Sequence, residues 1–163
     1  MRSVQSIPNK IFTLPDLQQQ LKRWRLLNKK IVFTNGVFDI LHQGHIASLS
    51  EAASHGNILI VGVNANASVK RLKGDSRPVN DEQSRALLLA SLTMTDAVIV
   101  FEEDTPYNLI TAIMPDVLVK GGDYTIDTIV GAKEVIANGG EVIIAPILEG
   151  FSTTSIIERM KQQ

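Results

Sequence analysis

Two histidines form the first group of residues whose types and spacing suggest chemistry. His42 and His45 are three residues apart, so on a helix both imidazoles lie on the same face. They follow Gly36 and the apolar run at residues 31–33, an order typical of a buried strand, a glycine turn and a helix. Backbone N–H groups and the positive end of a helix dipole collect at such a turn and attract anions. The stretch therefore predicts a site for phosphate chemistry.

Other chemistries suit the histidine pair less well. A metal site would need a third ligand from Asp39, Asp123 or His55, because the chain contains no cysteine. A serine hydrolase would need a G-x-S-x-G turn, and neither that pattern nor a P-loop or dinucleotide-binding fingerprint follows the first apolar run. A purely structural pair is the remaining alternative, and the glycine turn directly before the pair argues against it.

A locally basic segment follows the second apolar run. Residues 64–79 hold four basic side chains and one acidic side chain, namely Lys70, Arg71, Lys73, Arg77 and Asp75. The sequence predicts a loop here, and loops after the strands of an open α/β sheet emerge at the edge where ligands bind. Composition alone favours a phosphate clamp and a solvated surface loop equally. The neighbouring histidines favour the clamp.

Two further polar clusters are expected at the same edge of the sheet. The turn after residues 117–119 combines a cation, two glycines that allow close approach to a ligand, and a carboxylate: Lys120, Gly121, Gly122 and Asp123. A hydroxyl cluster, Ser152, Thr153 and Thr154, precedes the last helical pattern. Each has a structural alternative, a simple turn for the first and helix capping for the second. Capping hydroxyls and free N–H groups also hold phosphate oxygens, so the second cluster can serve both roles.

The elements that would position these clusters alternate between short apolar runs and helical patterns. The apolar runs cover residues 31–33, 58–63, 97–101, 117–119 and 142–147. Continuous apolar runs are typical of strands covered on both faces, so the pattern predicts an α/β fold with an open parallel sheet of about five strands and helices on both faces. The expected helices cover residues 42–54, 80–92, 106–114, 129–138 and 154–161.

A further helix is expected before the first strand, at about residues 14–29. Leu17, Leu21, Trp24 and Leu27 fall on one face of it. An aromatic in such a stripe usually packs against a core instead of binding a ligand. The chain of 163 residues fits one compact unit. We therefore expect a single domain over residues 1–163, with this helix as an N-terminal extension.

The charge balance excludes several classes of partner. Sixteen basic and seventeen acidic residues give a net charge of −1, so no overall positive field attracts nucleic acid or an anionic membrane. No apolar run approaches the length of a membrane span, and residues 1–8 lack the apolar core of a signal peptide. A cytoplasmic protein is expected. The absence of cysteine excludes disulfides and thiolate metal sites.

The motifs together resemble a known family. Residues 36–39 (GVFD), 42–45 (HQGH) and 152–154 (STT) look like the nucleotidyltransferase superfamily with H-x-G-H and S-T-T motifs, whose members share a Rossmann-like sheet. Within this superfamily, the sequence is similar to stand-alone D-glycero-β-D-manno-heptose-1-phosphate adenylyltransferases. Four segments carry this similarity: residues 33–36 (FTNG), 67–74 (ASVKRLKG), 77–80 (RPVN) and 119–124 (VKGGDY). The resemblance runs from about residue 30 to residue 160. Many relatives are fused to a sugar kinase domain, for which this chain has no room.

The resemblance implies a reaction and its catalytic residues. AMP would pass from ATP to a heptose 1-phosphate, giving ADP-heptose for lipopolysaccharide core or related glycan synthesis, and pyrophosphate. The sugar phosphate is largely anionic at neutral pH and needs no general base, so His42 and His45 are expected to donate hydrogen bonds to the α-phosphate. Lys73 is expected to bridge the two phosphates that must meet. Mg²⁺ is expected through the ATP phosphates without protein ligands, and a homodimer is implied.

Binding residues follow from the same resemblance. The residues expected to bind the nucleotide are Thr34, Asn35, Gly36, Phe38, Lys120, Gly121, Asp123, Ser152, Thr153 and Thr154. Asp39 and Arg77 are expected to bind the acceptor, and for Asp39 two alternatives remain, Mg²⁺ binding through water and capping of the helix near His42.

Two other functions remain open on the sequence. One is a cytidylyltransferase acting on another phosphorylated polyol, and the other is a non-catalytic nucleotide-binding sensor. Sugar-alcohol phosphate cytidylyltransferases often carry an arginine shortly before the S-T-T motif, whereas residues 148–151 read LEGF here. That departure disfavours cytidylyl transfer.

Overall fold

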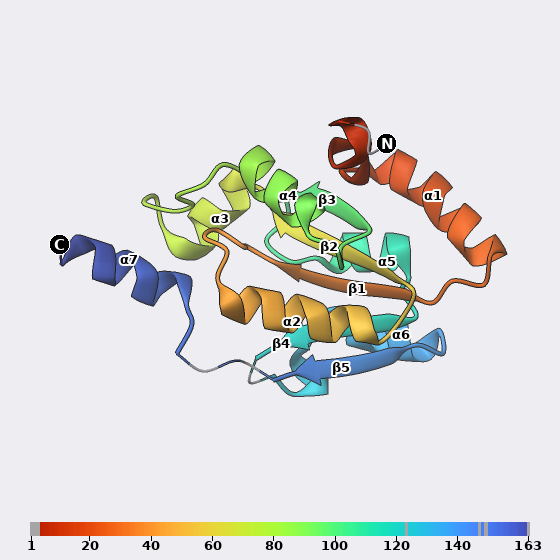
Figure 1. Cartoon of the computed structure of the whole chain (residues 1–163). Helices are drawn as coiled ribbons and strands as arrows, with labels where there is room; N and C mark the ends of the chain where they lie inside the picture. Colours follow the sequence, from red (N-terminus) through yellow and green to blue (C-terminus); the bar gives the residue numbers. More distant parts are fainter. Residues whose placement is uncertain (1–3, 123, 147, 149, 163) are drawn as a thin grey trace.

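The computed structural model describes residues 4–122, 124–146, 148 and 150–162, and its centre is a parallel sheet (Figure 1). The five strands run in the order β3-β2-β1-β4-β5 and every pair is parallel. Their bounds are β1 Ile31–Gly36, β2 Ile58–Asn64, β3 Ala97–Phe101, β4 Val117–Gly121 and β5 Glu141–Ala145. Each expected apolar run forms a strand, and the α/β prediction is confirmed. Residue 147, the expected end of the last run, lies outside the described residues.

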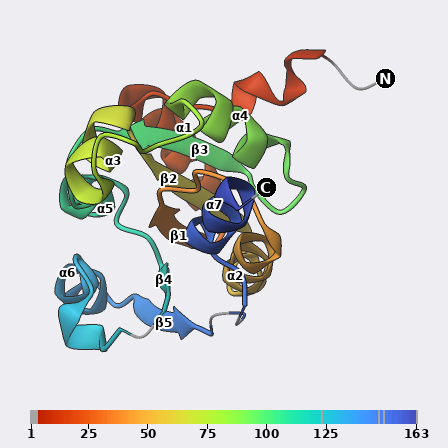
Figure 2. The same cartoon turned by 90° about the vertical axis from the view of Figure 1, so that its left-hand side faces the viewer.

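Helices cover both faces of the sheet (Figure 2). Their bounds are α1 Leu14–Leu26, α2 Gln43–Ser54, α3 Asn66–Lys73, α4 Glu82–Ser91, α5 Tyr107–Ile113, α6 Ala132–Ala137 and α7 Thr153–Lys161. Short 3₁₀ helices span Val4–Ser6, Pro8–Lys10 and Ile126–Thr128. The expected helices all form, with ends that differ by up to about three residues, as is usual for boundaries read from sequence.

The strands feed two separate cores because side chains alternate between the faces of a sheet. In β1, Ile31 and Phe33 pack on the face covered by α1, α5 and α6, whereas Val32 packs on the face covered by α2 and α4. All three side chains are fully buried. Trp24 packs against the first of these cores, as expected for a helical stripe. The expected stripe was wrong at Leu27, which follows the end of α1 and is exposed. A strand buried on both faces fixes its own position, and with it the position of the turn that follows.

The predicted loop over residues 64–79 was wrong in its first half, where α3 forms. Ser68 and Val69 are the fully buried residues of this helix. Its last turn carries Lys70, Arg71 and Lys73. Basic side chains at a helix C-terminus interact favourably with the helix dipole. With a single buried apolar side chain, α3 leaves almost no periodic pattern in the sequence. Only the part after α3 is a loop, and it begins at Gly74, whose φ of 92° ends the helix.

The segment before α1 covers the edge of the sheet next to β3. Ile11 makes an isolated parallel bridge to Val98, and Lys10 donates from Nζ to the carbonyl oxygen of Thr95 at 2.7 Å. These contacts pair backbone groups that an edge strand would otherwise leave open. No helix of the described residues is long and apolar enough to cross a membrane.

Candidate active site

The turn between β1 and α2 lies at the carboxyl edge of the sheet. Phe38 takes a left-handed φ of 49°, and its ring folds back over Gly36, where a Cβ would lie only 3.0 Å from Cε2 of that ring. His42 occupies the N-cap position of α2 without a capping side-chain hydrogen bond. A Cβ on Gly44 would lie 3.1 Å from Nδ1 of His42. The two glycines therefore leave space for the aromatic ring and the imidazole that line the site.

The two expected catalytic histidines are in direct contact. Their ring centroids lie 3.7 Å apart with planes 21° from parallel, and the ring of Phe38 meets His45 edge-on at 5.2 Å. Burial lowers the pKa of His42. Burial and the neighbouring His42 lower the pKa of His45 to about 4, and the backbone of Ile40 partly opposes this. Both imidazoles are therefore mainly neutral near pH 7 without a ligand, and the protonated form expected next to phosphates has to be gained on binding.

One ring nitrogen of each histidine has no hydrogen-bond partner. Nδ1 of His42 and Nδ1 of His45 are both buried and lack a partner among the described residues. A buried polar atom without a partner costs about 1–3 kcal/mol. The histidine pair is therefore held in an energetically unfavourable arrangement, as functional sites often are.

A cavity of about 380 Å³ opens beside the histidines, here called the histidine cavity. It is lined by most of the expected site and by residues that were not expected: Val37, Phe38, Asp39, His42, Gly44, His45, Ser48, Lys73, Arg77, Gly121, Phe151, Ser152, Thr153 and Thr154. In both views α7 lies beyond the start of α2, at the carboxyl edge of the sheet (Figures 1 and 2). Two helix N-termini therefore border one cavity, an arrangement that favours anions.

The hydroxyl cluster caps the second of these helices. Ser152 accepts a hydrogen bond at Oγ from the backbone N–H of Ser155 at 3.0 Å. The capping interpretation is therefore confirmed. Ser152, Thr153 and Thr154 line the histidine cavity as well, so the same residues are placed for both roles.

A second cavity of about 380 Å³ adjoins the first and is here called the Lys120 cavity. Polar residues form one part of its wall, namely Asn35, Asn64, Lys73, Asp104, Thr105, Lys120, Tyr124 and Thr128, next to Gly36 and Val37. Apolar side chains form the rest, namely Leu72, Pro106, Ile110, Leu118, Ile129 and Val130. Lys120 donates from Nζ to Oδ1 of Asn35 at 3.2 Å and lies 5.7 Å from the centroid of the Tyr124 ring. Burial lowers the pKa of Lys120, so a bound anion would favour its charged form.

The expected nucleotide-binding residues are divided between the two cavities. Phe38, Gly121 and the hydroxyl cluster line the histidine cavity, whereas Asn35, Gly36 and Lys120 line the Lys120 cavity. Thr34 is buried within β1 and lines neither of them. Asp123 lies outside the described residues. Lys73 and Val37 line both cavities, which places Lys73 at their junction.

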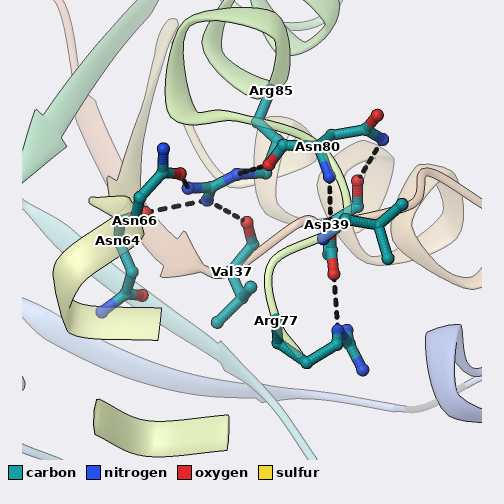
Figure 3. Close-up of polar contacts among 8 residues, drawn as sticks. Val37, Asp39, Asn64, Asn66, Arg77, Asn80 and Arg85 are labelled. Carbon is teal, nitrogen blue, oxygen red and sulfur yellow. Dashed lines mark hydrogen bonds and ion pairs between the residues drawn. The ribbon is translucent and has the colours of Figure 1, made fainter. Parts of the chain in front are cut away.

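Asp39 is held entirely by the protein (Figure 3). Its side chain, which is 1% exposed, accepts from Nε of Arg77 at 2.6 Å and from the backbone N–H groups of Val79 and Asn80 at 2.8 and 2.9 Å. Burial alone would raise the pKa of Asp39, but these hydrogen bonds and the charge of Arg77 lower it overall. None of these bonds goes to the first turn of α2. Asp39 thus fixes the loop after α3, with Arg77 at the wall of the histidine cavity.

Several lining residues carried no usable signal in the sequence. Ser48 lies one turn into α2, and Asp104 and Thr105 follow β3, in a segment without a motif. Arg85, inside α4, looks like an ordinary solvent-facing helix residue in the sequence but is fully buried. Their roles depend on which elements fold next to each other.

The described residues contain no group of three or more histidine, aspartate or glutamate side chains arranged to hold a metal ion. Both oxygens of Asp39, the most central carboxylate, already accept hydrogen bonds from the protein.

The chain is similar in sequence to known proteins. The sequence model of the family described as "Cytidylyltransferase-like" matches residues 33–159. The "Bifunctional protein HldE" of Rhodospirillum rubrum is 53% identical over 152 residues, which cover 93% of this chain and 31% of the relative. The protein of the same name from Nitrobacter winogradskyi is 56% identical over 144 residues, 88% of this chain and 30% of the relative. The chain thus spans about a third of the length of these relatives.

Two solved structures have similar folds. A lipopolysaccharide core biosynthesis protein from Thermoplasma volcanium is 32% identical with a TM-score of 0.59, covering 74% of this chain and 97% of that one. A pantoate-beta-alanine ligase from Francisella tularensis, complexed with an ATP analogue and beta-alanine, has a TM-score of 0.60 at 17% identity, covering 93% of this chain and 76% of that one. The second likeness concerns the fold alone.

Proposed function

The chain belongs to the cytidylyltransferase-like family and is a nucleotidyltransferase, and on this premise we propose that it transfers AMP from ATP to a heptose 1-phosphate. The observation that carries the proposal is the position of Lys73, which lines both adjoining cavities. A transfer between two phosphorylated substrates needs two compartments and a cation where they meet. The heptose acceptor rests on the resemblance of residues 77–80 and 119–124 to heptose-1-phosphate adenylyltransferases, and the similarity to the lipopolysaccharide core biosynthesis protein supports it.

ATP fits the histidine cavity through its phosphates. The N-termini of α2 and α7 border this space, and Ser152, Thr153 and Thr154 line it. His42 and His45 line it as well. Dipoles and donors of this kind bind phosphate oxygens without needing a net positive charge on the protein.

We place the heptose 1-phosphate at the polar wall of the Lys120 cavity. Asp104 and Thr105 provide oxygen atoms for hydrogen bonds with sugar hydroxyls, and Lys120 provides a positive charge for the phosphate. Asn35 and Lys120, expected from the sequence to bind the nucleotide, are reassigned in this proposal to the acceptor. Arg77, expected from the sequence to bind the acceptor, lines the histidine cavity and is reassigned to the ATP phosphates, with Asp39 orienting it.

The transfer is a single in-line displacement. An oxygen of the acceptor phosphate forms a bond to the α-phosphorus, the bond from that phosphorus to the bridging oxygen breaks, and pyrophosphate leaves with the electron pair. The nucleophile is already anionic, so no side chain has to remove a proton. His42 and His45 donate hydrogen bonds to the α-phosphate oxygens as charge builds up, and Lys73 offsets the repulsion between the substrates. Mg²⁺ carried by the ATP phosphates would neutralise charge on the pyrophosphate.

The family resemblance supports three further proposals. We infer a homodimer, a cytoplasmic location, and a single domain with α1 as its N-terminal extension. Light scattering coupled to size-exclusion chromatography measures the first directly, and a monomer at micromolar concentration would contradict it.

A pyrophosphate-release assay tests the reaction. Purified protein is incubated with Mg²⁺, heptose 1-phosphate and either ATP or CTP, and the sugar nucleotide product is identified by mass spectrometry. Release with ATP supports the proposal, and release only with CTP assigns a cytidylyltransferase instead. ATP binding without turnover of any phosphorylated sugar or polyol would favour a nucleotide sensor.

A further inference from the structure

Arg85 is a buried cation whose partners are all neutral groups. Its side chain is fully buried in α4, and Nε donates to the carbonyl oxygen of Asn80 at 3.0 Å. Nη1 donates to the carbonyl oxygens of Val37 and Asn64 at 2.7 and 2.8 Å, and Nη2 donates to Oδ1 of Asn66 at 2.9 Å. Figure 3 shows the guanidinium at the centre of these four acceptors.

The four acceptors belong to the segments that carry the site. Val37 lies in the turn between β1 and α2 and lines both cavities. Asn64 ends β2, and Asn66 begins α3, the helix that ends at Lys73. Asn80 follows the loop that carries Arg77, and its own N–H and side-chain amide bind Asp39. A single side chain thus joins the strand ends to both cationic segments.

A buried charge is an expensive way to fill space in a core. Transfer of an ionised group out of water costs several kcal/mol unless it is hydrogen-bonded, and apolar residues of similar volume are often as stable in such positions. Burial lowers the pKa of Arg85, and the charges of Asp39, Glu82 and Asp81 partly oppose this. What arginine offers that an apolar residue or lysine does not is a rigid, planar set of donors that reaches separate acceptors at once.

We propose that Arg85 is a positioning residue for the transfer reaction, which holds α3 and the loop after it at a fixed place relative to the β1 turn. Lys73 is thereby kept at the junction of the cavities and Arg77 at the wall of the histidine cavity. The consequence for catalysis rests on the proposed function, whereas the consequence for the position of α3 does not.

The Arg85→Lys variant separates geometry from charge. Lysine keeps the positive charge but, as a flexible point donor, cannot reach all four acceptors. We expect kcat to fall about 10-fold or more at a temperature where the variant is folded, by analogy with other losses of preorganised geometry. The control is Leu17→Val in α1, which thins a fully buried position in the core on the other face of the sheet. It should lower the melting temperature and leave kcat and KM unchanged.

A double-mutant cycle tests whether Arg85 acts through Lys73. In a Lys73→Ala background, Arg85→Lys should cost less than about 3-fold in kcat, because the group that it positions is already gone. If Arg85 only stabilised the fold, the fold-changes in kcat from the two substitutions would multiply. Asn66→Ala is a second, milder variant, which cuts only the bond to α3 and leaves the buried charge in place. It should show the same coupling to Lys73 even if Arg85→Lys folds poorly.

Amide hydrogen exchange and ATP titration decide the proposal independently of the acceptor. In the substrate-free protein, Arg85→Lys and Asn66→Ala should speed exchange in residues 66–80 and leave α5, on the other face of the sheet, unchanged. Arg85→Lys should also weaken ATP binding. Unchanged exchange, or effects in the cycle that multiply, would overturn the proposal. If the wild-type protein binds ATP but never turns over heptose 1-phosphate, the proposed function fails, and the exchange data still decide the role of Arg85.

Discussion

The imidazole rings of His42 and His45 are stacked, with centroids 3.7 Å apart, and each ring has an unpaired, buried Nδ1. Burial, and next the repulsion between two positive charges at this distance, lower the pKa of His45 to about 4 in the free protein. The pair is therefore stable as neutral rings and becomes a better donor only when an anion arrives. The neutral rings of the ligand-free site are thus linked to the donor role expected of them once ATP is bound.

Removal of either imidazole should slow the reaction strongly. We expect His42→Ala and His45→Ala each to lower kcat by about 10²-fold or more, as the loss of a preorganised donor to a developing charge does in other enzymes. Steady-state pyrophosphate release measures this. The control is His55→Ala, since His55 pairs with Glu51 through its ring, lies at the far end of α2 and lines neither cavity. A near-normal kcat would exclude that histidine from the transition state.

ATP binding should take up protons through His45. Because bound phosphates raise the pKa of this imidazole from about 4, the bound form holds a proton that the free form lacks at intermediate pH. The affinity for ATP should therefore rise as the pH is lowered towards the free pKa. Calorimetric titrations in two buffers with different ionisation enthalpies measure the uptake. His45→Gln should reduce this proton uptake. The difference in uptake between wild type and His45→Gln excludes the protons that ATP itself takes up or releases.

The same depressed pKa affects folding without any ligand. The unfolded chain binds the His45 proton below about pH 6.5 and the folded protein only near pH 4, so the stability that this histidine contributes is present above pH 6.5 and lost as the pH falls. Urea unfolding across this range should show a flatter pH dependence for His45→Gln than for wild type, whereas His55→Gln should follow the wild type.

Lys73 should matter for binding and for turnover. Lys73→Ala is expected to raise KM and lower kcat together, because the charge that offsets the repulsion between the two phosphates is lost from the junction of the cavities. Lys70→Ala removes the same charge from the same helix at an exposed position that lines neither cavity. If the two variants behave alike in the pyrophosphate assay, only the overall charge of α3 matters.

Asp39 should be more important for stability than its position near a ligand cavity suggests. Asp39→Asn leaves Arg77 without its ion-pair partner and puts an amide among donors, and breaking a buried pair of this kind costs about 3 kcal/mol or more. Urea unfolding measures the loss. The control is Asp75→Asn, because Asp75 is exposed in the same loop. Its free energy of unfolding should stay within about 0.5 kcal/mol of wild type. Equal stability of the two variants would mean that the Asp39 network contributes little to the fold.

The fold was largely readable from the sequence because its strands are buried on both faces. Runs such as residues 58–63 are apolar without alternation, and only a covered parallel sheet makes such runs favourable. The helix α3 was missed because a short helix with one buried apolar residue and three basic residues in its last turn has the composition of a loop. Its position depends on packing that the local sequence does not encode.

The sequence by itself determined the chemistry of the site: the histidine pair, the glycine turn and the hydroxyl cluster all follow strands or begin helices, and parallel strands bring such ends to one edge. The tertiary structure decided how that edge is divided. It placed Asn35 and Lys120 in a different cavity from His42, and Lys73 between the two. It also revealed the bonds of Arg85 to Val37, Asn64 and Asn66, which join segments far apart in the chain. Such distances depend on the packing of α4 against the sheet, and no local pattern records them.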